Sequence, residues 1–234
     1  MTAGNIQKAL RDLADPVIAE HSQRFFKTGR GQYGEGDQFL GIRVPVIRVQ
    51  AKRFENTSLQ EIQRLLRAPF HEERLCALLM LVQKFSKSAA DERKGIYQLY
   101  LNNTRHINNW DLVDSSAYHI VGAYLADKDR QALYTLARSE SLWERRIAII
   151  ATLHLIRQSD FDDALAISGL LINDHEDLIH KAVGWMLREI GKRSLSVEKA
   201  FLKKHYKKMP RTMLRYAIEK FPEPERKAYL QGTA

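Results

Sequence analysis

The chain has 234 residues, 44% of them hydrophobic and 28% charged, with a net charge of +9 and one cysteine. This composition excludes a disordered chain, a disulfide-stapled secreted domain and a membrane protein, since no apolar run approaches the roughly 20 residues of a membrane span. The N-terminal residues lack a signal-peptide core, so we expect a cytoplasmic protein in which Cys76, within the run RLCALLMLV, is a buried and inert thiol.

Amphipathic patterns with a helical period follow one another along the whole chain. Because no alternating stretch longer than four residues interrupts them, the sequence predicts an all-α fold. The expected helices cover residues 4–14, 16–27, 45–55, 58–67, 70–86, 90–102, 109–125, 129–138, 142–157, 161–172, 176–191, 195–206, 209–220 and 224–231.

The expected helices repeat at intervals of 31 to 40 residues. The segments ERLCALLML, VDSSAYHIV, RRIAIIATL, IHKAVGWML and LRYAIEKF align on a small residue that allows helices to approach closely, namely Ala77, Ala117, Ala148, Ala182 and Ala217. One helix pair per unit at this spacing predicts an α-solenoid of degenerate HEAT-like repeats, with a concave surface lined by the second helix of each pair. We expect a single domain over residues 1–234.

The segment KTGRGQYGEGDQF, residues 27–39, breaks the helical pattern. Its first three glycines, Gly29, Gly31 and Gly34, have the spacing of a dinucleotide-binding fingerprint. That fingerprint has to follow a strand and begin a helix, whereas here a predicted helix precedes it. We therefore expect a flexible loop or a small hairpin, with Arg30 at its tip able to contact a phosphate.

Metal and nucleophile sites find no support in the sequence. HEER at residues 71–74 lacks the second histidine of a zinc-binding helix, and His175 and His180 are five residues apart and do not share a helix face. We expect the histidines at the surface or at helix caps, and neither a metal nor another cofactor.

The stretch INNWDLVDSSAYHI, residues 107–120, places a carboxylate on an apolar helix face. At about 100° per residue, Asp114 lies at the edge of the apolar stripe that begins at Trp110. If Asn108 caps the helix, Asp111 is explained by the positive helix end. A carboxylate on an apolar face has to be paired, protonated or functional, so Asp114 is either the partner of an arginine or part of a site.

An arginine for either role is present in LWERRIAIIATLHL, a helix that is apolar nearly all round. Arg146 begins the second turn of this helix. A structural bridge to Asp114 would be catalytically silent, whereas the forked guanidinium also suits a phosphate. The residues alone leave both interpretations open.

Trp185, in HKAVGWMLREIGK, lies outside the apolar arc of its helix. Its neighbours on that side are Lys181 and Arg188. A ring between two cations fits a sugar or base that is bordered by phosphates. The alternative is a ring that packs against the next repeat.

All of the excess positive charge lies in the last quarter of the chain. Residues 181–234 contain 14 Lys and Arg against 5 Asp and Glu, while residues 1–180 contain 23 of each. Such clustering fits a nucleic-acid partner better than a uniformly solubilising surface, which is the alternative. The cations that we expect to contact DNA are Arg30, Lys181, Arg188, Lys192, Arg193, Lys203, Lys204, Lys207, Lys208 and Arg211.

The segments NNWDLVDSSA, LWERRIAI and IHKAVGWMLREIGK, together with FLGIRVPVIR, resemble the DNA alkylation repair family of HEAT-like DNA glycosylases over residues 25–221. Family members remove cationic alkylated bases, such as 3-methyladenine and 7-methylguanine, from duplex DNA, which they wrap in a basic concave face. The resemblance implies a DNA N-glycosylase that acts as a nucleoid-associated monomer without a cofactor.

The resemblance also implies roles for individual residues. Asp114 matches the catalytic carboxylate, Trp110 and Trp185 match the rings that bracket the deoxyribose, and Arg146 matches the phosphate-holding arginine. Arg188 matches a position that contacts DNA.

The sequence departs from the family pattern in two places. Phe25 stands where active members carry a tyrosine, and the glycine-rich segment resembles an insertion of sister branches that bind branched DNA and excise bases poorly. The alternatives are therefore a non-catalytic binder of damaged or branched DNA with the same fold, and a HEAT-type scaffold for other proteins.

Overall fold

The computed structural model describes residues 1–234 and confirms the predicted all-α fold. Its only β-type pairing is an isolated bridge between Gln38 and Phe70. No helix combines the length and the hydropathy that crossing a membrane requires. The helices are α1 (Ala3–Arg11), α2 (Pro16–Phe25), α3 (Val44–Arg53), α4 (Leu59–Leu66), α5 (His71–Lys87), α6 (Ala90–Leu101), α7 (Trp110–Asp114), α8 (Ala123–Leu125), α9 (Gln131–Ala137), α10 (Leu142–Ala151), α11 (Leu153–Ile156), α12 (Asp162–Leu170), α13 (Asp177–Gly191), α14 (Leu195–His205), α15 (Arg211–Ala217) and α16 (Glu223–Gln231).

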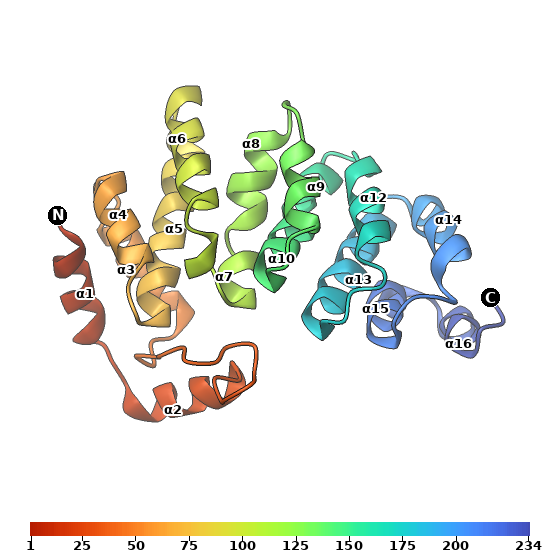
Figure 1. The fold of residues 1–234 in the computed structure, drawn as a ribbon, viewed down its shortest axis with the longest axis horizontal. Helices are drawn as coiled ribbons and strands as arrows, with labels where there is room; N and C mark the ends of the chain where they lie inside the picture. Colours follow the sequence, from red (N-terminus) through yellow and green to blue (C-terminus); the bar gives the residue numbers. More distant parts are fainter. The chain divides into compact units, whose positions relative to one another are not determined.

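The chain forms two compact units, unit 1 over Met1–Ile120 and unit 2 over Val121–Ala234. Within unit 1, α5 is the central helix and packs against α3, α4, α6 and α7. Its apolar run is buried from Leu75 to Leu81. Helix α2 lies crosswise below the ends of α3 and α5 (Figure 1), and the glycine-rich segment follows it.

Cys76 lies in the middle of that buried run and is fully inaccessible. Burial, with a smaller contribution from the charge of Glu73, raises the pKa of its thiol to about 12. The predicted burial of Cys76 is confirmed, and the raised pKa disfavours the thiolate, which is the reactive form.

Residues 109–125 do not form the single helix that their pattern predicts. Helix α7 ends at Asp114, and a π-helical turn over Tyr118–Gly122 leads into α8. The hydroxyl of Ser116 donates a hydrogen bond to the carbonyl oxygen of Leu112 at 2.6 Å. A serine that bonds to the backbone in this way competes with the helical ladder, which is why the helix ends after little more than one turn.

In unit 2, α13 is the central helix and packs against α10, α12, α14 and α15. The alanines on which the repeats align are fully buried, as their predicted packing role requires: Ala77, Ala117, Ala148, Ala182 and Ala217. A glycine lies where α13 and α15 meet, because a Cβ atom on Gly184 would overlap the carbonyl oxygen of Met213 and the Cβ atom of Tyr216. Gly184 therefore fixes how closely α13 and α15 pack.

Replacing Gly184 by alanine is expected to lower the free energy of unfolding by about 1–3 kcal/mol, as overpacking does in other cores. The added methyl group meets backbone atoms of α15, which cannot rotate away. Gly169→Ala in α12 is the matched control, since nothing lies within 4 Å of its added Cβ atom and alanine favours the helix. Urea unfolding followed by circular dichroism measures both variants, and equal stability of the two would contradict the close packing at Gly184.

Candidate functional site

Trp110 and Asp114 are the first and last residues of α7. Both are half-buried, while Leu112 and Val113 between them are fully buried and attach the helix to unit 1. The cap is Asn109 rather than the predicted Asn108: its backbone is extended, and its Oδ1 accepts the N–H of Trp110 at 2.9 Å. A short helix thus presents an indole ring and, one turn later, a carboxylate.

The ring of Trp110 rests on two phenylalanines from the end of α2. Phe26 stacks on it with ring centroids 5.4 Å apart, and Phe25 meets it edge-on at 6.0 Å. Phe26 is half-buried and also stacks on Phe39 at 5.0 Å, whereas Phe25 is 58% exposed. Since Phe25 has no hydroxyl, it offers only an aromatic surface beside Trp110.

A buried cluster of charged side chains lies next to these rings. His71, at the start of α5, is 2% exposed and lies between two carboxylates. Its Nδ1 is 2.8 Å from Oδ2 of Asp37, and its Nε2 is 2.8 Å from Oδ2 of Asp111. Arg74 donates to the other oxygen of Asp37 at 2.6 Å. The prediction that the histidines lie at the surface or at helix caps is wrong for His71. Asp111 lies in the first turn of α7, as predicted, and it also pairs with His71.

The charges of this cluster determine which groups are ionised. Burial lowers the pKa of His71, but the charge of Asp111 and the hydrogen bonds to both carboxylates outweigh it and raise that pKa to about 9. For Asp37 the signs are opposite. Burial raises its pKa, but the hydrogen bond to His71 and the charge of Arg74 outweigh burial, so the pKa of Asp37 is lowered. At neutral pH the cluster therefore contains an imidazolium between two carboxylates.

The glycine-rich segment is a run of turns that packs against the start of α7. The N–H of Gly34 donates to the carbonyl oxygen of Lys27 at 3.1 Å, and the N–H of Gly31 donates to the carboxylate of Glu35 at 2.7 Å. A Cβ atom on Gly34 would meet the carbonyl oxygen of Phe26 at 2.5 Å and Nδ2 of Asn109 at 3.5 Å. The segment therefore folds back on the end of α2 where only glycine fits, and it touches the cap of α7 at an ordinary contact distance. Arg30 lies on it and is exposed.

The segment FLGIRVP, residues 39–45, follows these turns and is held in place by Glu72 of HEER. Glu72 is 3% exposed, and its carboxylate accepts the backbone N–H groups of Leu40, Gly41 and Ile42 at 2.8, 2.7 and 3.2 Å. Charge-assisted bonds of this kind are about twice as strong as neutral ones. Glu73 in turn accepts hydrogen bonds from Gln7 and Arg11 of α1, and it is fully buried. All four polar residues of HEER therefore attach N-terminal segments of unit 1 to α5.

Asp114 is close enough to the buried ring of Tyr100 to influence its ionisation. Tyr100 is fully buried and bonds to the hydroxyl of Ser116 at 3.0 Å. Burial raises the pKa of Tyr100, and the negative charge of Asp114 raises it further. The negative charge of Asp114 thus lies near enough to act on a buried ring of unit 1.

In unit 2, Arg146 is 4% exposed on α10 and donates a hydrogen bond to the carbonyl oxygen of Leu178. Trp185 on α13 is half-buried, as expected for a ring outside the apolar arc, and its indole N–H donates to Glu189 at 3.3 Å. Burial raises the pKa of Glu189, but its bonds to Lys192, Arg193 and Trp185 outweigh this and lower it. The carboxylate of Glu189 thereby fixes the orientation of the Trp185 ring.

The predicted DNA-contacting cations of unit 2 fall into two groups. One group is paired with carboxylates: Lys181 with Asp177, Arg188 with Glu219, and both Lys192 and Arg193 with Glu189. The other group is exposed at the end of α14 and the start of α15, and it forms no ion pair: Lys203, Lys204, Lys207, Lys208 and Arg211. This second group is a cationic segment that is open to a polyanion.

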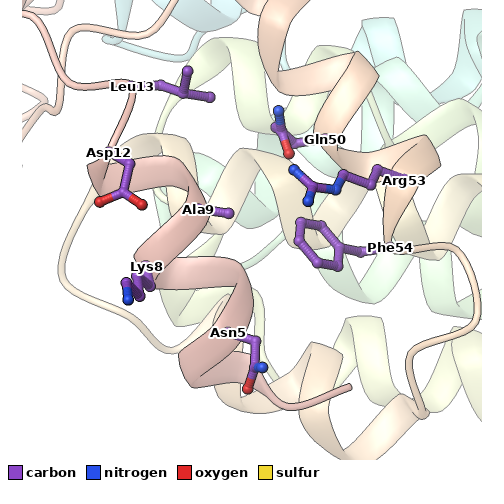
Figure 2. A pocket seen from close by; sticks show the side chains of 8 residues that line it. All are labelled: Asn5, Lys8, Ala9, Asp12, Leu13, Gln50, Arg53 and Phe54. Carbon is purple, nitrogen blue, oxygen red and sulfur yellow. The ribbon is translucent and has the colours of Figure 1, made fainter.

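A hollow of about 400 Å³ lies between α1 and α3 (Figure 2) and is lined by charged, polar and apolar side chains. The guanidinium of Arg53 lies over the ring of Phe54, 5.3 Å from its centroid. None of the predicted site residues lines this hollow. No group of three or more His, Cys, Asp or Glu is arranged to hold a metal ion.

Sequence reasoning missed the residues below Trp110. No local pattern singled out Phe26, Phe39 or Asp37, and His71 was expected at the surface or at a helix cap. The available signal was the start of a strongly apolar helix at HEER, since polar residues at the end of a buried helix have to be satisfied there.

Known proteins similar to this chain point to one family. A model of the family described as DNA alkylation repair enzyme matches residues 6–221. A solved structure described as a predicted DNA alkylation repair enzyme from Enterococcus faecalis is similar with a TM-score of 0.70 at 19% identity, covering 90% of this chain and 97% of that one. The crystal structure of smu.31 from Streptococcus mutans UA159 is similar with a TM-score of 0.52 at 17% identity, covering 94% and 99%. At these identities the structural likeness shows the fold. Among curated proteins, none matches the chain.

Proposed function

Because the chain belongs to the family of DNA alkylation repair enzymes, we propose that it is a DNA glycosylase for cationic alkylated purines, of the 3-methyladenine and 7-methylguanine type, in duplex DNA. The observation that carries this proposal is the half-buried carboxylate of Asp114, which follows the ring of Trp110 by one helical turn. A protein scaffold has no use for such a pair beside aromatic rings.

The reaction needs stabilisation of positive charge on the sugar. An alkylated purine already carries a positive charge, so the electron pair of the bond between C1′ and the base leaves with the base and neutralises it. Water then adds to C1′ and loses a proton to the solvent. Since no leaving-group protonation is required, a carboxylate near C1′ and aromatic faces are the groups that lower the barrier.

Each residue has a role in this proposal. Asp114 stabilises the cationic sugar and orients the attacking water. Trp110 and Trp185 contribute aromatic faces, each worth on the order of 1–2 kcal/mol toward a desolvated cation. Arg146 binds a phosphate through its guanidinium, and the unpaired cations from Lys203 to Arg211 bind the DNA backbone.

Release of 7-methylguanine from methylated duplex DNA tests this function. Wild-type protein is expected to release the free base at neutral pH, as detected by chromatography, and to lose DNA affinity steeply as salt rises. The alternative that Phe25 favours, a non-catalytic DNA binder, predicts the same salt dependence with no base release. A protein scaffold predicts neither result.

A further inference from the structure

The imidazole of His71 joins three parts of unit 1 that surround the proposed catalytic helix. Through Nδ1 it contacts Asp37 at the end of the glycine-rich segment, and through Nε2 it contacts Asp111 in α7, both at 2.8 Å. Its ring also stacks on Phe39 at 4.5 Å and lies 5.0 Å from Phe26, the ring that carries Trp110. A single side chain thus contacts both the polar and the aromatic support of α7.

The contact with Asp111 is a polar side-chain anchor at the start of this helix, in addition to the stacking of Trp110 on Phe26. His71 is the hydrogen-bond partner of Oδ2 of Asp111, and Oδ1 of Asp111 is buried without a partner. Oδ1 of Asn108 and Nδ2 of Asn109 are also buried without partners. A helix of five residues does not hold its own shape, so its position depends on such contacts with the rest of the unit.

We propose that His71 is a positioning residue for the Trp110–Asp114 helix, acting as an imidazolium that holds Asp111 with one N–H and Asp37 with the other. The inference rests on the proposed function and extends it to a buried residue outside the Trp110–Asp114 pair. His71 acts on the indole through Phe26 and on the helix that carries the carboxylate through Asp111.

The charge state follows from the hydrogen bonds. Both carboxylates are acceptors, and a neutral imidazole has only one N–H, so only the doubly protonated ring serves both. The charged groups facing the ring are Asp111 from α7 and Asp37 from the glycine-rich segment, and Arg74 of α5 pairs with Asp37. Two anions and two cations balance, which makes loss of the proton from His71 unfavourable.

The pH dependence has a definite sign. The pKa of His71 is raised from 6.5 to about 9 in the folded protein. Its contribution to stability is therefore complete below pH 6.5, declines as the pH rises above that value, and is lost as the pH passes about 9. The same proton keeps α7 in place, so kcat is expected to fall above pH 9 as well.

Two substitutions separate positioning from folding. The amide nitrogen of glutamine can take the place of Nε2 and keep the bond to Asp111, whereas that of asparagine can take the place of Nδ1 and keep the bond to Asp37. Each variant loses one bond and the charge. His71→Asn is expected to lower kcat for 7-methylguanine release by about 10- to 100-fold with little change in KM, since small misplacement of reacting groups has costs of that size. His71→Gln is expected to stay closer to wild type.

The Asp111→Asn variant supplies a readout that a purely structural role would not move. Its amide oxygen still accepts the Nε2–H, but the charge that raises the pKa of His71 is gone. The alkaline fall in kcat is then expected at lower pH than in wild type, in parallel with the titration of His71 followed by NMR of its ring. If kcat of Asp111→Asn fell at the same alkaline pH as kcat of wild type, the inference would be overturned.

Wild-type activity is measured first, because it decides the proposed function separately. With an active wild type, equal kcat values for His71→Asn and His71→Gln overturn the positioning role. With an inactive wild type the proposed function fails, and the indole N–H signal of Trp110 decides the positioning role instead. That signal is expected to shift in His71→Asn and to stay near its wild-type place in His71→Gln; equal shifts would contradict the inference.

Discussion

Asp114→Asn is expected to slow the release of 7-methylguanine by about 10²- to 10³-fold, the usual effect of removing one electrostatic group that faces a developing charge. The side chain keeps its size, so the change removes charge and leaves the packing of α7 in place. Weaker DNA binding cannot produce the loss, because removal of a negative charge makes the protein more basic. Single-turnover release at saturating protein isolates the chemical step.

Asp127→Asn is the matched control for this experiment. It removes the same charge from an exposed side chain, 80% accessible and paired with Lys128. Its rate of base release is expected to equal that of wild type. Equal rates for Asp114→Asn and wild type would instead remove Asp114 from the mechanism and leave the family fold without a catalytic carboxylate at this position.

Glu72→Gln is expected to have the largest effect on stability, lowering the free energy of unfolding by about 3 kcal/mol or more. The carboxylate accepts three backbone N–H groups from Leu40, Gly41 and Ile42, and it is almost fully buried. Glutamine has one acceptor oxygen, and its NH₂ group would face donors. Urea unfolding of the full chain, followed by circular dichroism, measures the loss.

The control for Glu72 is Glu55→Gln, which removes a carboxylate of unit 1 that is partly exposed and pairs with Lys87. Exposed pairs of this kind contribute little to stability. The midpoint of unfolding is therefore expected to stay at its wild-type value. A similar loss in both variants would mean that the bonds of Glu72 to FLGIRVP are not the cause of the effect.

The helices were predictable because their periodic patterns are strong and local. Most observed helices begin and end within a few residues of the predicted ranges, and the aligned alanines are all buried. Two predicted helices are divided: 109–125 breaks after Asp114, and 142–157 forms α10 and α11. The break after Asp114 was not predictable from the hydrophobic period, since it depends on Ser116 bonding to the backbone rather than to water.

The support of the candidate site was hidden for a different reason. Asp37, His71 and Asp111 are 34 and 40 residues apart along the chain, so their pairing is a property of packing that no local pattern contains. Asp111 satisfied a simple explanation as a helix-start residue, which concealed its buried partner. Trp110 and Asp114 stood out in the sequence because an aromatic ring and a carboxylate on one apolar face have no simple local explanation.

Cys76 gives unit 1 a built-in chemical reporter. It is the only thiol in the chain, it is fully buried, and it lies on α5 five residues after His71. A thiol reagent can reach it only while α5 is open to solvent, so the labelling rate counts those openings. Labelling of this one thiol thus reports, in the intact protein, how often α5, the helix that carries HEER, opens to solvent.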